Sequence, residues 1–214
     1  MTSLDMSLPD PSSPSGMIDW GSLLSRVLPR VDLFVPSIEE LLYAMDRQGF
    51  TRLAGNVGGE QIIRQVTFTD LARLAERVQA QGVSAVLIKL GDRGAYLRTG
   101  PRGVAGLAGW ANRELYTPVF TVPAVAGTAG SGDATIAGFL ASVTRELSAE
   151  EALTMAVAVG GCCVEAPDAT SGVRSWEDTL RRVKGGWTRR PVTVEEKGWR
   201  PTVNGVWAGP NDRG

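Results

Sequence analysis

The chain alternates short apolar runs with amphipathic segments. The apolar runs predict strands at residues 2–8, 31–35, 83–90, 95–99 and 119–125. Segments with apolar residues at helical spacing predict helices over 18–30, 37–46, 67–82, 132–146, 148–164 and 175–184. This alternation predicts an α/β fold, a doubly wound and mostly parallel sheet flanked by helices.

Local signals at the ends of these segments support the assignment. Asp19 is placed to cap the first helix, and the Ser-Ala-Glu-Glu run from Ser148 forms a capping box. Gly82 stands where a helix C-cap belongs. Residues 47–66 predict no clear element and contain a Gly-rich bend.

The last thirty residues differ in composition from the rest. Residues 185–214 are rich in Gly and Pro and hold three of the six tryptophans. We therefore predict one domain over 1–184 and an irregular extension over 185–214, whose indole rings dock on the main body. A site for a peptide or partner protein is the alternative for these rings.

The composition of the chain excludes several classes of function. The net charge of −1 gives no basic excess to attract nucleic acid or an anionic membrane. Histidine is absent, which excludes Ser-His-Asp and Cys-His catalysis and histidine metal sites. The two cysteines, Cys162 and Cys163, are adjacent, so a disulfide framework is not expected and a reducing cytoplasm fits best. No apolar run approaches the ~20 residues of a membrane span, and the N-terminus does not resemble a signal peptide.

Residues 126–138, AGTAGSGDATIAG, place glycines and one acid where a helix begins. A Gly-rich turn entering a helix presents unpaired N–H groups and the positive end of the helix dipole, which together favour an anion. A carboxylate beside a bound phosphate repels it unless it has a role, and accepting a proton from an attacking hydroxyl is such a role. The alternative is structural: Asp133 in a first helical turn is favourable electrostatically, and glycines make loops.

Four segments together extend this interpretation. GTAGSGDATIAGF resembles the second signature of the PfkB (ribokinase-like) carbohydrate kinases, and VLIKLGDRGAYL resembles the strand–turn–strand with which that family contacts ATP. VDLFVPSIEEL and LDMSLPDPSSPSG resemble two further segments of the family, and all four occur in the family's order. The resemblance covers roughly residues 3–175.

The resemblance implies a catalytic group at residues 130–133. Asp133 would be the base that deprotonates the acceptor hydroxyl. The backbone amides of Gly130, Ser131 and Gly132 would form the anion hole for the transferred phosphoryl group. The acceptor would be a small sugar-like molecule.

The resemblance also implies sites for ATP and Mg²⁺. Lys89, Gly91 and Gly94 would line the ATP phosphates and ribose, and Ala156 and Gly160 lie on the helix that would pack against adenine. Glu40 would organise Mg²⁺ through water. Glu40 is equally explained by a capping box with Ser37, a structural role.

This sequence departs from the family pattern at several positions. Ser37 replaces an asparagine, Gly127 replaces an aspartate, and Lys89 stands where threonine is frequent. The family's N-terminal strands and lid have no counterpart here, so we expect an incomplete domain. The leading hypothesis is a cytoplasmic, ATP- and Mg²⁺-dependent carbohydrate kinase. The alternatives are a non-catalytic nucleotide-binding remnant, or a fragment that needs the N-terminal part; a homo-oligomer stays open.

Overall fold

The computed structural model describes residues 1–56, 62–192 and 194–214. The helices are α1 (Trp20–Val27), α2 (Ile38–Met45), α3 (Arg47–Asn56), α4 (Ile62–Gln65), α5 (Phe68–Gln79), α6 (Ser131–Val143), α7 (Ala149–Cys163) and α8 (Trp176–Lys184). The strands are β1 (Ser3–Leu4), β2 (Leu33–Phe34), β3 (Ala85–Lys89), β4 (Ala95–Thr99), β5 (Glu114–Thr117), β6 (Arg200–Pro201) and β7 (Trp207–Ala208). The α/β fold class is confirmed.

One sheet organises the described chain, with strand order β1-β2-β3-β4-β5-β7-β6. β1, β2 and β3 are parallel, and β3-β4, β4-β5, β5-β7 and β7-β6 are antiparallel. The sheet is therefore mixed: its N-terminal part has the expected parallel strands, and every neighbouring pair from β3 onward is antiparallel.

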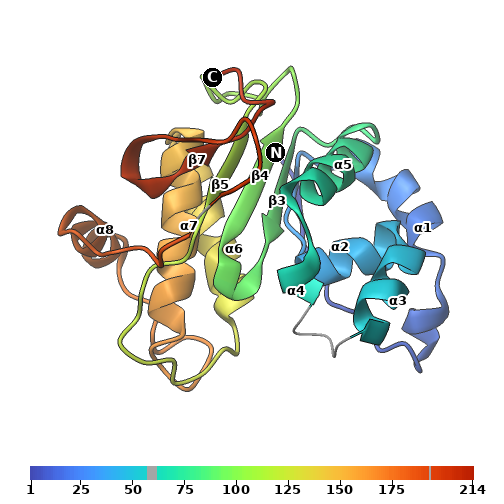
Figure 1. The fold of residues 1–214 in the computed structure, drawn as a ribbon, viewed down its shortest axis with the longest axis horizontal. Coiled ribbons are helices and arrows are strands. Elements are labelled where there is room, and N and C mark those ends of the chain that lie inside the picture. Colours follow the sequence, from blue (N-terminus) through green and yellow to red (C-terminus); the bar gives the residue numbers. More distant parts are fainter. Residues whose placement is uncertain (57–61, 193) are drawn as a thin grey trace.

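Helices cover both faces of the sheet, as Figure 1 shows, with α1 to α5 on one side and α6 to α8 on the other. Alternate residues of each strand face opposite layers. In β3, Val86 and Ile88 pack with the α1–α5 layer, whereas Ala85 and Leu87 pack with α6 and α7. The continuous apolar run at 83–90 is thus explained by burial on both faces.

The predicted strand at 119–125 is wrong. The strand lies earlier, at β5 (Glu114–Thr117), and is followed by Pro118. Pro123 falls within the predicted run, and proline cannot donate to a strand ladder. The strand predicted at 2–8 is present only as β1, because the chain leaves the sheet edge after Leu4.

Residues 47–66, for which the sequence predicted no clear element, contain α3 and α4. The Gly-rich bend between them falls at 57–61, outside the described residues. The two predicted N-caps are confirmed: the Asp19 side chain accepts from the Ser22 amide, and Ser148 forms a capping box with Glu151. The C-cap predicted at Gly82 is wrong by two residues, since α5 ends with Ala80 as its C-cap. No helix of the described residues is long and apolar enough to cross a membrane.

The C-terminal segment packs on the main body. Trp187 stacks on Phe120 with ring centroids 4.4 Å apart, and Trp199 lies 4.4 Å from the Phe68 ring. The predicted docking of the rings is confirmed for these two. The segment also adds β6 and β7 to the sheet, which its Gly and Pro content did not predict, while a boundary at residue 184 stays a prediction.

Candidate functional site

A cavity of about 260 Å³ lies where β3 ends and α6 begins. It brings together six of the predicted residues, namely Lys89, Gly91, Gly94, Ser131, Gly132 and Gly160. The rest of the wall is largely apolar, formed by Val119, Phe120, Val122, Val125, Val157 and Val164. The wall thus combines a polar part, formed by Lys89 and the start of α6 and called the polar end below, with a largely apolar surface.

The polar end is built on the N-terminus of α6. Gly130 caps the helix with a left-handed φ of +72°, which turns the chain into the helix. The Ser131 N–H donates to the Thr128 carbonyl at 3.2 Å, so this amide is already engaged. The N–H groups of Gly130, Gly132 and Asp133 have no partner among the described residues, as expected at a helix N-terminus. These three amides are the ones open to an anion.

The glycines of the cavity differ in whether the packing around them leaves room for a side chain. Gly94 has φ +110°, and a Cβ there would collide with the Thr117 carbonyl and lie 2.8 Å from Pro118 Cα. At Gly160, a Cβ would collide with the Thr135 hydroxyl, because α6 and α7 pack closely there. The fold alone therefore explains why glycine occupies positions 94 and 160. At Gly132, a Cβ would meet only Lys89, with Nζ at 3.8 Å.

Lys89 ends β3 and reaches the same place from the sheet. Its Nζ donates to Asp5 Oδ1 at 2.9 Å, and its side chain is only 13% exposed. Asp5 follows β1, so the ion pair joins the ends of two parallel strands across β2. An ammonium group held beside the α6 N-terminus reinforces the preference of the cavity for an anion.

Glu40 lies near this end but does not line the cavity. Its carboxylate accepts from the Ser37 N–H at 2.6 Å, and the Glu40 N–H donates to the Ser37 hydroxyl at 3.2 Å. The structural alternative, a capping box on α2, is thus confirmed. Burial raises the pKa of Glu40, and nearby Lys89 opposes that shift.

Asp133 and Ala156 differ from the six residues above. Asp133 is exposed at the start of α6, beside the cavity wall and outside its lining. Ala156 is fully buried in the core and does not line the cavity, whereas Val157 and Gly160 on the same helix do. α7 thus contacts the cavity through neighbours of Ala156, since the residue itself points into the core.

Two charged residues of the cavity escaped the sequence analysis. Asp92 lies in the turn between β3 and β4, and Arg190 belongs to the C-terminal segment. Their side chains form an ion pair of 2.8 Å. Asp92 could have been found from the Gly-Asp-Arg-Gly turn, but no local pattern marks Arg190.

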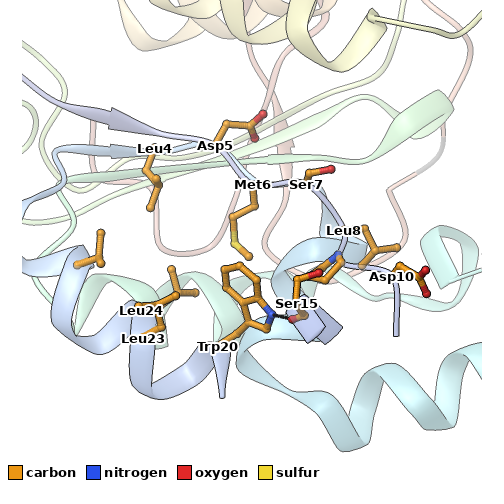
Figure 2. Close-up of a pocket in the computed structure, with 12 residues that line it drawn as sticks. Leu4, Asp5, Met6, Ser7, Leu8, Asp10, Ser15, Trp20, Leu23 and Leu24 are labelled. Atoms are coloured by element: carbon orange, nitrogen blue, oxygen red, sulfur yellow. Dashed lines mark hydrogen bonds between the residues drawn. The ribbon is translucent and has the colours of Figure 1, made fainter. Parts of the chain in front are cut away.

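A second hollow, of about 470 Å³, lies on the other side of β1. Figure 2 shows Met6 and Trp20 lining it together, with the Trp20 indole N–H donating to the Ser15 carbonyl at 2.9 Å. Asp5 points to the opposite side from Met6, as alternation along an extended chain requires. This hollow is mainly apolar, and Asp5, which pairs with Lys89 of the first cavity, also belongs to its lining.

Comparison with models of known protein families shows to which family the chain belongs. A model of the pfkB family of carbohydrate kinases matches residues 2–176. The chain belongs to this family. The match includes β1 to β5, α6 and α7, and therefore nearly the whole wall of the cavity; Arg190 lies beyond it. No curated protein sequence matches the chain.

Solved structures show the same fold. Ribokinase of Thermotoga maritima is 21% identical with a TM-score of 0.55, and 85% of this chain covers 48% of that one. Arabidopsis thaliana ribokinase, solved with ribose and ATP, is 22% identical with a TM-score of 0.56, covering 73% and 42%. Aminoimidazole riboside kinase of Salmonella enterica is 20% identical with a TM-score of 0.57, covering 83% and 50%. The chain spans about half the length of these relatives.

Proposed function

We propose that the chain carries the nucleotide-binding and phosphoryl-transfer part of an ATP-dependent kinase for a sugar-like alcohol. One observation carries the proposal. The free amides at the start of α6, the Lys89 ammonium and the uncrowded Gly132 meet in a cavity whose remaining wall is largely apolar. Phosphates suit the polar groups and a planar base suits the apolar wall.

The transfer step follows from the position of Asp133. Its carboxylate takes the proton of the acceptor hydroxyl while that oxygen forms a bond to the γ-phosphorus of ATP. The bond from phosphorus to the β,γ-bridging oxygen breaks, and ADP leaves with the electron pair. The amides of Gly132 and Asp133 stabilise the charge on the transferred group, with Gly130 and Ser131 shaping the turn that aims them.

Mg²⁺ would neutralise part of the phosphate charge when bound. No cluster of three or more acidic or thiol ligands exists among the described residues, so the phosphates would supply most of its ligands. Glu40 fits a role through water, because one of its carboxylate oxygens is held by Ser37 and the other accepts no hydrogen bond from a described residue. We therefore place Glu40 outside the direct ligands of the ion.

The test is the Asp133→Asn variant. Because only the proton acceptor is lost, ADP formation with a sugar panel should fall by ~10²–10⁴-fold, while Mg·ATP affinity stays within about twofold. Asp178→Asn is the matched control, an exposed aspartate on α8 away from the cavity. Full activity of Asp133→Asn would refute the assignment of the base.

A second function is nucleotide binding without transfer, favoured by the share of the solved relatives that the chain covers, about half. It predicts Mg·ATP binding by calorimetry with no acceptor-dependent ADP formation across pentoses, hexoses and nucleosides. Acceptor-dependent ADP formation by the wild-type chain, absent in Asp133→Asn, would exclude this alternative.

A further inference from the structure

Arg190 differs in origin from the other residues that line the cavity between β3 and α6. It belongs to the C-terminal segment, beyond the residues 2–176 that the family model matches. Its side chain nevertheless lines the cavity, together with Gly91, Asp92 and Gly94 of the β3–β4 turn. A segment outside the matched region thus completes the wall at this point.

The backbone around Arg190 is held firmly. The Arg190 N–H donates to the Val119 carbonyl at 2.8 Å, and the Thr121 N–H donates to the Thr188 carbonyl at 2.9 Å. Between them, Arg189 pairs with Phe120 as an isolated antiparallel bridge. The segment therefore lies against residues 119–121 like a short strand, and this pairing fixes where the Arg190 side chain begins.

Side chains on both sides strengthen this anchorage. The half-buried Arg189 guanidinium donates to the Pro118 carbonyl and to the Thr154 hydroxyl, each at 3.0 Å. It also lies 4.2 Å from the Phe120 ring centroid, and Trp187 stacks on the same ring. Arg189 and Trp187 thus serve to dock the segment, which leaves Arg190 as the residue aimed at the cavity.

The charges around Arg190 favour an anion. Its guanidinium contacts Asp92 at 2.8 Å, and Arg64 contacts the same carboxylate oxygen at 3.0 Å. Two positive charges share one negative charge, so one positive charge is in excess. At the other end of the same turn, Lys89 forms an ion pair with Asp5.

We infer that Arg190 binds the polyphosphate chain of the nucleotide, opposite Lys89 and across the β3–β4 turn. The inference rests on the proposed function and adds a phosphate contact supplied by the C-terminal segment. A guanidinium with five N–H donors can exchange one carboxylate bond for a phosphate bond while keeping another. The side chain is 54% exposed, which leaves it room to turn toward a bound phosphate.

The experiment compares Arg190→Ala, Arg190→Lys and Arg181→Ala by calorimetry with ATP, ADP and adenosine. Arg181 is the matched control, an exposed arginine paired with Asp178 on α8 and outside the cavity. We expect Arg190→Ala to weaken ATP and ADP about tenfold, the low end for a charged hydrogen bond, with adenosine unchanged. Arg190→Lys should lie between, and Arg181→Ala should match the wild type.

The remaining outcomes distinguish a failure of this inference from a failure of the proposed function. Equal weakening of all three ligands would mean that Arg190 only holds the segment in place, and unchanged ATP and ADP affinity would mean that it makes no phosphate contact; either overturns the inference alone. A wild-type chain that melts cooperatively and binds no nucleotide would overturn the proposed function and this inference with it. Melting curves of each variant establish that the fold is retained.

Discussion

Two glycines of the cavity should respond in opposite ways to the same added methyl group. Gly132 lies in the first turn of α6, where a Cβ would have only the Lys89 side chain nearby, at 3.8 Å from Nζ. Alanine is favoured over glycine in a helix by roughly 0.5–1 kcal/mol. We therefore expect Gly132→Ala to leave the free energy of unfolding unchanged or to raise it by up to about 1 kcal/mol.

The affinity of Gly132→Ala for nucleotide should fall, although its stability is retained. A phosphate oxygen bound to the Gly132 amide needs an N···O distance of about 2.9 Å, in the space beside Lys89 that the new methyl group would enter. Losing this approach should raise the Kd for Mg·ATP at least about tenfold, or about 1.4 kcal/mol. Stability and affinity would then move independently, which a structural role for Gly132 does not predict.

Gly94→Ala is the contrasting variant. The φ of +110° is open only to glycine, at a cost of about 1–3 kcal/mol for other residues, and the methyl group would also collide with the Thr117 carbonyl. We expect a loss of more than about 3 kcal/mol by urea unfolding, a large share of the stability of an ordinary domain.

Urea unfolding and calorimetry with Mg·ATP on the two variants test the reasoning. Wild-type ATP affinity in Gly132→Ala would refute the claim that phosphate approaches this amide. Wild-type stability in Gly94→Ala would refute the structural explanation of the turn glycine. The two refutations are independent because each concerns one variant and one measurement.

Two ion pairs give further predictions. Lys89→Met should raise the Kd for ATP and ADP about 10- to 100-fold, because it removes a charged donor. The double variant Lys89→Met/Asp5→Asn controls for the Asp5 carboxylate that the single variant leaves unpaired. Recovery of affinity in the double variant would contradict a direct contact between Lys89 and phosphate. Arg182 donates to both oxygens of Glu165 at 2.6 and 2.8 Å and holds the pKa of Glu165 below the ordinary value for a glutamate. That stabilisation is fully present above the ordinary pKa and is lost as the pH falls through the lowered pKa. Urea unfolding should therefore show a smaller loss between about pH 7 and about pH 3 for Arg182→Met than for the wild type, and an equal loss would contradict this assignment.

The helices could be predicted because their signals are local. The apolar spacing of 67–82 and the capping box at Ser148 act within a few residues, and the structure has that capping box. The Gly-rich turn into α6 could be located for the same reason. The contiguous motif around the start of α6 carries its own geometry, whatever lies elsewhere in the chain.

β5 could not be predicted because its stability depends on distant partners. It begins with Glu114, a charged residue that is 1% exposed. Its carboxylate accepts from the Tyr96 hydroxyl at 2.8 Å, from Arg98 at 3.1 Å and from the Asn211 amide at 2.7 Å. A buried carboxylate is tolerated only with such partners, and none of them is a sequence neighbour.

Arg190 illustrates the same limit at the site. Its place in the cavity depends on pairing with Val119, about seventy residues earlier, so neither periodicity nor motif could indicate it. Sequence patterns thus identified the part of the cavity made by contiguous turns. They missed the part made where two distant segments meet.

The arrangement of the first turn of α6 makes binding and transfer separable. Gly132 is in the cavity wall, and the carboxylate of the next residue, Asp133, lies outside that wall and is exposed. If Asp133 is the proposed base, an acceptor hydroxyl would reach it from outside the cavity wall. Gly132→Ala should weaken binding of ATP whether or not an acceptor is present, whereas Asp133→Asn should affect only turnover with one. If both variants lose ATP binding equally, the two residues act together on the helix terminus, and the division of roles proposed for them is wrong.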